Sequence, residues 1–455
     1  RFRLDRIASI LAGGPLRNPE KTELDTYLQV EMVRGDVSFH GQFHVDGLTL
    51  YDPWLAEQPI ENLNVSARIA GAYQRRGHRL NIEEVAINFR GVELFFDAFV
   101  HFPGGLDEET GLVRAQKRVE VHARVPPVGC QKALNAIPPV LAPFLQGFDL
   151  RGTYALDMRL EVDWANLDEL ALDGIDSTIG LKRCQIARAP ERIEADHFRG
   201  EFTQSVEVQP NESLSFQVGP SNPDYVPLEQ VSPYVINSFL TTEDSGFFSH
   251  RGFIVREFRS ALIRNLKKGS FVYGASSITM QLVKNLLLYR SKTISRKLQE
   301  LFLTYFVEQT LGKERILEIY VNIIEFGPRI YGIGAAAQHY FGKHPSELNP
   351  VEAAFFSSLL PSPKVRYAQY CQGKLTRWGG DKILRILKKM RERDRISEDE
   401  YQQALNTPLV FRYDADHDSE KCRRDLKALL RNTPSTLPQR DVDDDDPDDA
   451  ELVAP

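Results

Sequence analysis

In the first 200 residues, apolar side chains recur at every second position. The clearest runs of this kind cover residues 37–45, 80–89 and 154–162. Alternation with period two predicts β-strands that each bury one face. Within the second run the phase of the alternation shifts between Ile82 and Val85, which indicates a β-bulge. The sequence therefore predicts a β-rich domain over residues 1–205.

From residue 232 onward the apolar period becomes that of an α-helix. Residues 255–266 and 298–306 each place an apolar stripe on one side of a predicted helix, and Gly312 is expected to end the second helix. Two further helices are predicted over residues 313–322 and 350–360, the latter with Pro350 in its first turn.

The fold class predicted from these periods is α+β and multidomain. A connector over residues 206–231, rich in Pro, Asn, Ser and Gln, joins the β-rich domain to a mainly helical domain over residues 232–412. Residues 413–455 are predicted to form an acidic, disordered tail, because residues 441–449 are almost wholly acidic. Binding of divalent ions by that run is the alternative, although a disordered run lacks a preformed cage of ligands.

Composition narrows the class of protein. The chain has 455 residues and a net charge of −7, which argues against a general nucleic-acid binder. No run approaches the roughly 18 consecutive apolar residues that a membrane span needs. Because the chain starts at Arg1 rather than Met, we expect a signal or anchor segment upstream.

The four cysteines form no CxxC pair, so the sequence supports neither a zinc site nor a thioredoxin-like motif. Cys130 and Cys184 could bridge in an oxidising compartment. Their spacing alone favours two separate buried thiols.

The first candidate for chemistry is the segment from Glu243 to Gly252, which contains two carboxylates, two aromatic rings and His250. A carboxylate beside hydrophobic rings can have its pKa raised toward the range that suits proton transfer. The alternative is an acid pair at a helix end beside a core phenylalanine.

The second candidate is a concentration of positive charge. Residues 251–300 hold eleven Lys or Arg and only two acids, Glu257 and Glu300. A solvated helix face normally mixes acids with its bases, so this field suits a phosphate-bearing substrate. DNA or RNA would also suit it, but no nucleic-acid motif is present. Lys292, Arg296 and Glu300 are four residues apart and share one helix face, as either a phosphate site or a simple ion pair.

Five blocks make residues 232–367 resemble glycosyltransferase family 51, the peptidoglycan transglycosylases of bifunctional penicillin-binding proteins and monofunctional enzymes. Residues 243–252 are similar to EDxxFxxHxG, 274–285 to GGSTITQQxxKN, and 296–300 to RKxxE. Residues 313–322 are similar to KxxILExYLN, and 332–343 to the block that ends AAxxYFGK. The resemblance covers about a third of the chain and implies a lysozyme-like domain.

The resemblance also implies the roles of individual residues. Glu243 would be the general base for the 4-hydroxyl of the acceptor sugar, and Glu300 the second essential carboxylate. A polyprenyl pyrophosphate would leave with inversion at the anomeric carbon. Substrate and pyrophosphate contacts would come from the following residues: Asp244, Phe247, His250, Ser276, Gln281, Lys284, Asn285, Lys292, Arg296 and Lys297.

The chain departs from the family pattern at several positions. Gly246 stands where the family usually has Arg, and Lys292 stands where it also usually has Arg, which replaces a bidentate phosphate contact by a point charge. In the second block, Ala275, Ser277 and Met280 replace the usual Gly, Thr and first Gln. Both carboxylates and most cations remain, so an active enzyme is expected, with altered activity as the alternative.

No SxxK, SxN and KTG set accompanies these blocks, so no transpeptidase site is expected. The β-rich half weakly resembles AsmA-type envelope domains, on phrases such as residues 46–53, which would imply lipid handling or a scaffold. A plain β-sandwich is the alternative reading.

The resemblance implies a place and partners for the protein. We expect it at the outer, periplasmic face of a bacterial cytoplasmic membrane, acting on lipid II and the growing glycan chain, with a separate transpeptidase or envelope proteins and without nucleic acid. No cofactor or protein metal site is implied, although a divalent cation such as Mg²⁺ or Mn²⁺ could accompany the pyrophosphate. The rival readings are an inactive scaffold that holds lipid-linked substrate and a lysozyme-like lytic enzyme.

Overall fold

The structure is a computed structural model of the 455-residue chain. It describes residues 2–7, 13–102, 117–176, 178–193, 195–209, 212–270, 274–288, 293–413 and 417–432. The chain divides into two compact units. The first comprises Arg1–Arg192, Phe253–Phe271 and Ser291–Tyr305, and the second Ile193–Gly252, Val272–Arg290 and Phe306–Pro455.

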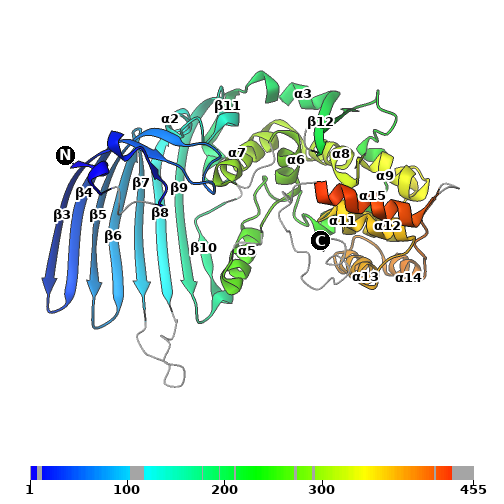
Figure 1. Ribbon diagram of the computed structural model, residues 1–455. Helices are drawn as coiled ribbons and strands as arrows, with labels where there is room; N and C mark the ends of the chain where they lie inside the picture. Colours follow the sequence, from blue (N-terminus) through cyan, green and yellow to red (C-terminus); the bar gives the residue numbers. More distant parts are fainter. Residues whose placement is uncertain are drawn as a thin grey trace. The chain divides into compact units, whose positions relative to one another are not determined.

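The first unit is built on an antiparallel sheet of eleven strands (Figure 1). The strand order is β1-β3-β4-β5-β6-β7-β8-β9-β10, with β2 paired to β4 and β11 paired to β9. The bounds are β1 Phe2–Arg3, β2 Leu16–Arg17, β3 Glu23–Val33, β4 Asp36–Leu50, β5 Ile60–Gln74, β6 Arg79–Phe89, β7 Val92–His101, β8 Arg118–Gly129, β9 Asp149–Asp163, β10 Ala171–Asp173 and β11 Cys184–Arg188. Two hairpins turn on residue pairs with positive φ, Arg34-Gly35 and Arg90-Gly91, as tight two-residue loops require.

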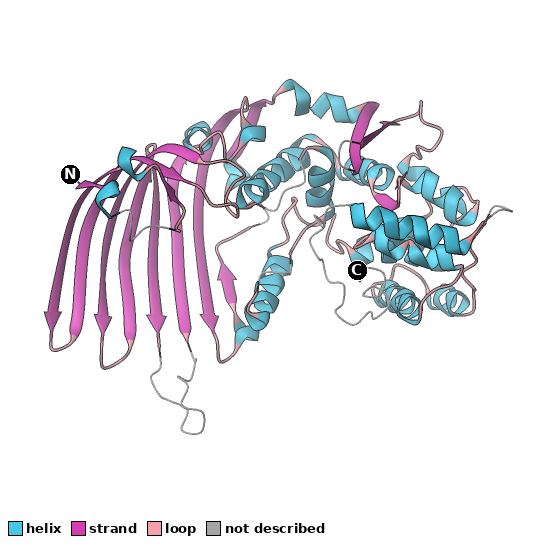
Figure 2. Ribbon diagram, in the orientation of Figure 1, coloured by secondary structure: helices cyan, strands magenta, loops and turns pink. Residues whose placement is uncertain are grey.

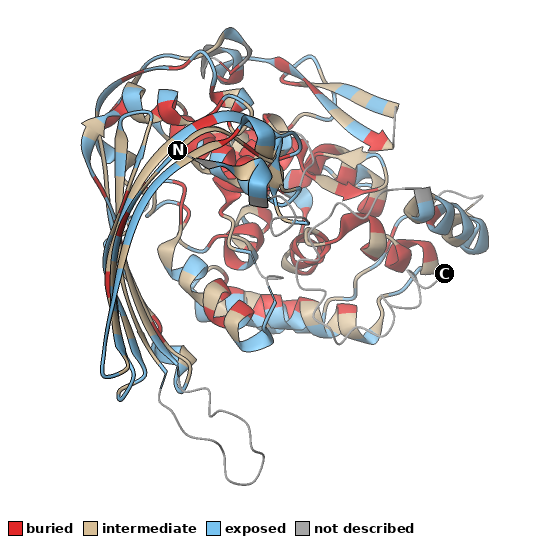
Figure 3. Cartoon of the chain, turned by 60° about the vertical axis from the view of Figure 1, so that its left-hand side comes forward, coloured by how far each residue is buried: buried red, intermediate tan, exposed pale blue. Residues whose placement is uncertain are grey.

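The register confirms the predicted alternation. Phe43 pairs with Ala67, Ala67 with Ile87, and Ile87 with Leu94, so one row of apolar residues crosses four strands on the same face. The register of β6 against β7 shifts between Ile82 and Val85, as the sequence predicted. The strands are curved in Figure 3, where most of their residues are of intermediate or full exposure.

The opposite face of the sheet is polar and carries ion pairs. Arg118 binds Glu161 at 2.6 Å, and His122 lies 2.9 Å from Asp157. The two faces therefore differ as period-two alternation requires.

Helices and short 3₁₀ segments complete the first unit. Their bounds are α2 Cys130–Ala136, α5 Val255–Lys268, η1 Leu4–Ile7, η2 Pro19–Lys21, η3 Pro143–Leu145, η4 Leu167–Glu169 and η5 Leu181–Arg183. Helix α5 ends at Gly269, whose φ of 68° is the left-handed conformation that glycine adopts freely. Ile263 of α5 forms a core cluster with Val162 and Leu170, so this helix covers the apolar face at the β9–β10 end.

Two elements cross the boundary between the units. The segment η6 covers Glu191–Ile193, and helix α7 covers Ile294–Thr310. Helix α7 confirms the helix predicted over residues 298–306, and of its predicted stripe Phe302, Tyr305 and Phe306 are buried while Leu298 is exposed. Gly312 does not end this helix, as had been expected, since α7 stops at Thr310 and Gly312, with a φ of −69°, is the N-cap of α8.

The second unit is mainly helical (Figure 2). Its bounds are α3 Ala195–Arg199, α4 Pro233–Thr242, α6 Ile278–Leu286, α8 Lys313–Ile323, α9 Ile333–Phe341, α10 Pro350–Leu359, α11 Pro363–Arg366, α12 Ala368–Gln372, α13 Arg377–Glu392, α14 Glu398–Leu405 and α15 Ser419–Asn432. Short elements are η7 Leu228–Gln230, η8 Pro345–Glu347, β12 Phe202–Gln209, β13 Glu212–Val218, β14 Glu325–Gly327 and β15 Ile330–Tyr331. The predicted helices over 313–322 and 350–360 are thereby confirmed to within one residue.

Helix α10 lies at the centre of this unit. It starts with Pro350 in its first turn and a capping box between Asn349 and Glu352, and every residue from Val351 to Leu359 is buried. Around it gathers an aromatic cluster of Tyr340, Phe341, Phe355, Phe356, Tyr370 and Phe411. The core of the second unit is therefore closed on all sides of this helix.

Several boundaries differ from the predicted ones. The predicted connector contains much of the hairpin β12–β13, whose alternation of Val206, Val208, Leu214 and Phe216 is masked in the sequence by polar neighbours. The predicted tail over 413–455 contains helix α15, which buries Leu426 against Ala368 and Cys371. The acidic run over 441–449 lies outside the described residues.

Two disulfides are present, Cys130–Cys184 and Cys371–Cys422. The expectation of separate thiols at Cys130 and Cys184 is therefore wrong. Spacing could not reveal the bond, because α2 and β11 are brought together by β9, against which α2 packs and with which β11 pairs. In the described parts of the chain, no helix has both the length and the apolar character that crossing a bilayer demands.

Candidate active site

The loop that follows helix α4 carries Glu243. This residue caps the C-terminus of α4, where its backbone N–H donates to the carbonyl of Phe239 at 2.8 Å. The side chain of Glu243 accepts a hydrogen bond from Nε2 of Gln281 on α6, at 2.7 Å to Oε2. The hydroxyl of Tyr320 on α8 donates to Oε1 of Gln281 at 3.2 Å. Because a hydroxyl that donates needs the amide oxygen, Tyr320 turns the amide NH₂ of Gln281 toward Glu243.

Asp244 is turned into the protein, with a side chain that is 0% exposed. Its Oδ2 accepts from the backbone N–H of Ile278 at 3.1 Å, and both its oxygens lie 2.9 Å from Nε2 of His250. Since Gly252 N–H donates to Nδ1 of His250 at 3.0 Å, the proton of a neutral ring lies on Nε2 and points to Asp244. The pair therefore closes the loop on itself and fixes it to the start of α6.

Phe247 is 1% exposed and fills the space beneath the loop. Lys313 Nζ lies 4.2 Å from the centre of its ring and 2.7 Å from Oε1 of Glu308, and Glu308 also accepts from the hydroxyl of Thr279. A cation over a buried ring is favourable, since the ring face is negative. Phe247 therefore anchors the loop to α6, α7 and α8.

The segment before α6 is held by Ser277. Its Oγ accepts from Met280 N–H at 3.1 Å as the N-cap of α6, and it donates to the carbonyl of Gly252. Ser277 thus keeps the hydroxyl of the threonine that the family pattern has there. Met280, which replaces a glutamine of that pattern, is a core residue with 1% exposure.

Three other predicted site residues, Ser276, Lys284 and Asn285, lie on helix α6 or just before it. Ser276 and Lys284 are half-buried, and Lys284 follows Gln281 by three residues, which places both on one side of α6. Asn285 is exposed, and its backbone carbonyl accepts from Gln204 of β12 at 3.0 Å.

The predicted residues of α7 form a compact charged group in the first unit. Glu300 is 2% exposed; its Oε2 accepts from Arg296 at 2.6 Å and its Oε1 from Lys297 at 2.7 Å. A buried carboxylate is tolerated when both oxygens are satisfied by cations in this way. Lys292 lies outside the described residues.

The structure therefore joins Glu243, Asp244, Phe247, His250 and Gln281 into one hydrogen-bonded and packed group in the second unit. It joins Arg296, Lys297 and Glu300 into another in the first unit. No group of three His, Cys, Asp or Glu side chains that could hold a metal ion occurs within the described ranges.

The fourth block of the family pattern is used for packing. Glu318 accepts from Leu228 N–H at 2.9 Å, from the Tyr225 hydroxyl at 2.8 Å and from Arg315. Burial raises the pKa of Glu318, but these hydrogen bonds and the charge of Arg315 together bring it below its usual value. Asn322 exchanges hydrogen bonds with both backbone groups of Val226 at 2.9 and 2.8 Å. Helix α8 therefore fastens the segment that leads into α4.

Sequence reasoning missed Tyr320, Thr279 and Glu308 as members of the site. Tyr320 belongs to an apolar stripe of α8 and is 0% exposed, so in sequence it reads as core. Its partner Gln281 lies 39 residues away, and nothing in the spacing pairs them.

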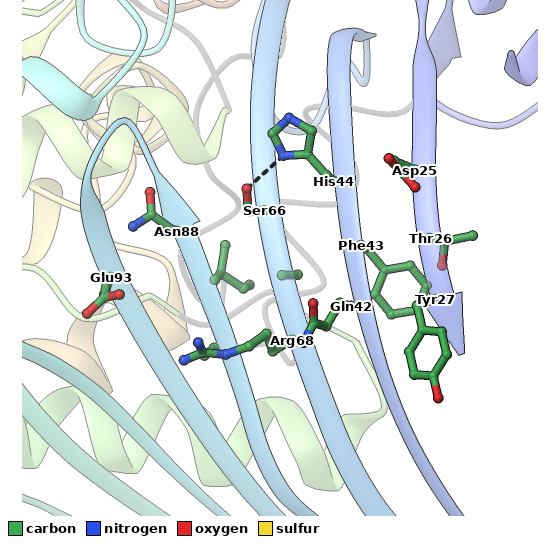
Figure 4. Close-up of a pocket in the computed structure, with 13 residues that line it drawn as sticks. Asp25, Thr26, Tyr27, Gln42, Phe43, His44, Ser66, Arg68, Asn88 and Glu93 are labelled. Carbon is green, nitrogen blue, oxygen red and sulfur yellow. Dashed lines mark hydrogen bonds between the residues drawn. The ribbon is translucent and has the colours of Figure 1, made fainter. Parts of the chain in front are cut away.

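A cavity of about 560 Å³ lies on the polar face of the sheet (Figure 4). It is lined by residues of five consecutive strands, among them Asp25, His44 and Arg68. His44 Nδ1 lies 2.8 Å from the hydroxyl of Ser66. The cavity contains none of the predicted site residues.

Comparison with known proteins gives the relationship. The model of the transglycosylase family matches residues 211–391. A biosynthetic peptidoglycan transglycosylase of Nitrosospira multiformis is 40% identical over 166 residues, which are 36% of this chain and 70% of that relative. The chain belongs to the transglycosylase family.

This transglycosylase covers a smaller share of the length of other relatives. A biosynthetic peptidoglycan transglycosylase of Nitrosomonas eutropha is 43% identical over 140 residues, 31% of this chain and 57% of its own. Penicillin-binding protein 1A of Aquifex aeolicus is 38% identical over 192 residues, 41% of this chain and 25% of its own. A crystal structure of penicillin-binding protein 1A from Haemophilus influenzae aligns with 49% of this chain and 24% of that chain, at 22% identity and a TM-score of 0.26, too low to compare folds.

The family match confirms the predicted recognition and extends it. It starts beside β13, inside the predicted connector, and includes Phe253–Phe271 and Ser291–Tyr305, which pack with the sheet in the first unit. The boundary between the compact units is therefore not the boundary of the family domain.

Proposed function

We propose that this transglycosylase polymerises lipid II into glycan strands, as a peptidoglycan glycosyltransferase. The observation that carries the proposal is the fixed, half-buried carboxylate of Glu243, which Gln281 orients from α6 at 2.7 Å. Family membership and the names of the relatives support the reaction class.

In the proposed reaction, Glu243 takes the proton of the acceptor 4-hydroxyl while that oxygen attacks the anomeric carbon of the donor. The new O–C bond forms as the bond from the anomeric carbon to the phosphate oxygen breaks, and the pyrophosphate leaves with the electron pair. One direct displacement inverts the configuration at the anomeric carbon. A general base of this kind has to lie within hydrogen-bond reach of the hydroxyl, so its orientation by Gln281 is part of its function.

Negative charge that develops on the leaving pyrophosphate requires cations aimed at it. We assign this task to Lys284, Lys292, Arg296 and Lys297, with Ser276 and Asn285 as polar contacts. Glu300 holds Arg296 and Lys297 at 2.6 and 2.7 Å, so we give it the role of fixing their positions beside the phosphate. The three carboxylates Glu243, Asp244 and Glu300 already accept hydrogen bonds from protein groups. A divalent cation, Mg²⁺ or Mn²⁺, would therefore be bound by the pyrophosphate oxygens, and its participation stays a prediction.

The protein belongs to the cell envelope, as its peptidoglycan-synthesising relatives imply. We propose the outer face of the cytoplasmic membrane, since two disulfides suit an oxidising compartment. Phe258, Ile294 and Leu298 are 40%, 43% and 48% exposed and are candidates for contact with the bilayer surface. An upstream anchor, a partner transpeptidase and the AsmA-like nature of the sheet stay predictions.

The test is polymerisation of labelled lipid II by the purified chain in detergent or lipid vesicles. We expect polymer from the parent protein and none from a matched sample without lipid II. Cleavage of preformed glycan without polymerisation would support a lytic enzyme. Binding of lipid II with neither reaction would support a scaffold, and either result contradicts the proposal.

A further inference from the structure

The turn between α13 and α14 carries two arginines that reach the end of helix α4. Arg393 is the C-cap of α13, Asp394 turns the chain with a φ of 55°, and Arg395 follows. Both arginines lie beyond the family match, which ends at residue 391. They are also 150 residues or more from the groups that they contact.

Their contacts bracket Glu243 along the backbone. Nη1 of Arg393 donates to the carbonyl of Thr241 at 2.7 Å, two residues before Glu243. Nη2 of Arg395 donates to the carbonyl of Ser245 at 3.1 Å, two residues after it. Nη1 of Arg395 also donates to the carbonyl of Asn237 at 3.1 Å, and Asn237 lies one helical turn before Thr241. In return, the amide of Asn237 donates to the carbonyl of Arg395 at 2.9 Å.

The electrostatics favour the contact of the two arginines with the end of α4 and oppose the closeness of the two arginines to each other. The C-terminal end of a helix carries partial negative charge, so two guanidinium groups at the end of α4 are stabilising. The repulsion between the two arginines is destabilising. Burial and the charge of Arg393 lower the pKa of Arg395, while the carboxylate of Asp244 raises it. Packing two like charges together is a cost that a single arginine would avoid, so the second arginine requires a reason.

We propose that Arg393 and Arg395 are positioning residues that hold the backbone on both sides of Glu243, and so set where its carboxylate meets the acceptor hydroxyl. The inference rests on the proposed role of Glu243 as base. Gln281 holds the carboxylate of Glu243, and the two arginines hold the backbone on both sides of that residue. With both ends held, the carboxylate has little freedom to leave the reactive geometry.

The experiment compares Arg395→Met, Arg393→Met and Arg395→Lys in the full chain. Arg391→Met is the matched control, because Arg391 lies in the last turn of α13, two residues before Arg393, but binds Glu398 at 3.1 Å and stacks on Tyr401. Steady-state polymerisation gives kcat and KM, thermal unfolding gives the folded fraction, and hydrogen exchange of residues 241–250 gives the mobility of the loop.

For Arg395→Met we expect kcat to fall about tenfold to a hundredfold with little change in KM, since displacement of a catalytic group by about 1 Å has effects of that size. The kcat of Arg393→Met should fall less, Arg395→Lys should keep part of the kcat that Arg395→Met loses, and the kcat of Arg391→Met should match that of the parent. Hydrogen exchange of residues 241–250 should speed up in Arg395→Met and Arg393→Met alone. Should Arg395→Met not fold, Arg395→Lys and Arg393→Met carry the same comparison.

An unchanged kcat in folded Arg395→Met and Arg393→Met, with the parent active, would overturn the inference and leave the proposed function standing. A parent that makes no polymer would instead refute the proposed function. In that case hydrogen exchange decides the inference: equal exchange of residues 241–250 in Arg395→Met and Arg391→Met overturns it, and faster exchange in Arg395→Met supports it.

Discussion

The sheet and the helical unit use apolar residues in different ways. In strand β7 no residue is buried, whereas in helix α10 every residue from Val351 to Leu359 is. Figure 3 shows the same contrast, with buried residues gathered mainly in helices. A strand that alternates with period two offers one apolar face and needs a second layer to bury it. A helix in the middle of a bundle is enclosed by its neighbours.

In the part of the sheet that the structure describes, α5 covers the apolar face at the β9–β10 end. At the other end, strand β3 pairs with β4 along its length and with β1 at its first two residues only. Five large apolar side chains of β3 are exposed: Tyr27, Leu28, Val30, Met32 and Val33. The contrast teaches that Glu243 and its partners belong to the unit whose packing is closed, since they lie against buried side chains such as Phe247.

The largest expected effect comes from removing a ring in each region. Phe355 is 0% exposed and touches Tyr340, Phe341, Phe356 and Phe411. Phe355→Ala should lower the free energy of unfolding by about 3–5 kcal/mol, because it leaves a cavity in a closed core. Denaturant unfolding of Phe355→Ala and of the parent measures this change in the free energy of unfolding.

The matched change in the sheet is Phe43→Ala, at a half-buried position whose ring faces the apolar side. Its loss should be smaller, about 1–2 kcal/mol, because water already reaches the site and no closed cavity forms. Equal losses in the two variants would show that the apolar face of the sheet is as well covered as the core around α10.

An effect smaller than that of Phe355→Ala is expected at Glu318. Glu318→Gln should cost about 1.5–3 kcal/mol at neutral pH, since it weakens hydrogen bonds to a charged acceptor. Because the pKa of Glu318 is lowered on folding, its stabilisation is fully present above the unfolded pKa of about 4.3 and is lost as pH falls through the lower folded value. Unfolding measured from pH 7 to pH 3 should show the gap between parent and variant narrowing below about pH 4.

A gap that stays constant over this pH range would mean that Glu318 is not held as a carboxylate by Arg315 and Leu228. Glu314→Gln on the same helix serves as the control, because Glu314 lies in the first turn of α8 and the segment before α4 does not depend on it.

The smallest effect is expected for Tyr320→Phe. The change removes only the hydroxyl that orients the amide of Gln281, at 3.2 Å, and keeps the ring in the core. We expect kcat for polymerisation to fall severalfold, about the value of one neutral hydrogen bond, with unchanged KM. A fall in the folded fraction that matches the fall in kcat would mean that Tyr320 acts on stability alone.

Local patterns predicted much of the fold. The alternation over 154–162 predicted β9, and the proline at the start of 350–360 predicted the first turn of α10, because each signal depends on neighbours in sequence. The placement of 253–271 was not predicted, since α5 packs on Val162 of β9 and on Leu170 just before β10, about a hundred residues earlier. Period alone cannot say which surface a helix covers.

The candidate site divides in the same way. The blocks around Glu243, Gln281 and Glu300 could be found in the sequence, because each is a short run of residues. The partners that orient them could not be found, since Tyr320 and Arg395 come from elements distant in sequence whose contacts arise only on folding. The disulfide between Cys130 and Cys184 is a third contact of this kind.

The central claim is that the carboxylate of Glu243 removes the acceptor proton. The most direct measurement is turnover and binding of lipid II by Glu243→Gln, beside Glu257→Gln as a control on the exposed surface of α5. We predict that Glu243→Gln binds lipid II as the parent does while its turnover falls about a hundredfold to ten-thousandfold, the contribution of a general base. Turnover of Glu243→Gln close to that of the parent and of Glu257→Gln would contradict the account.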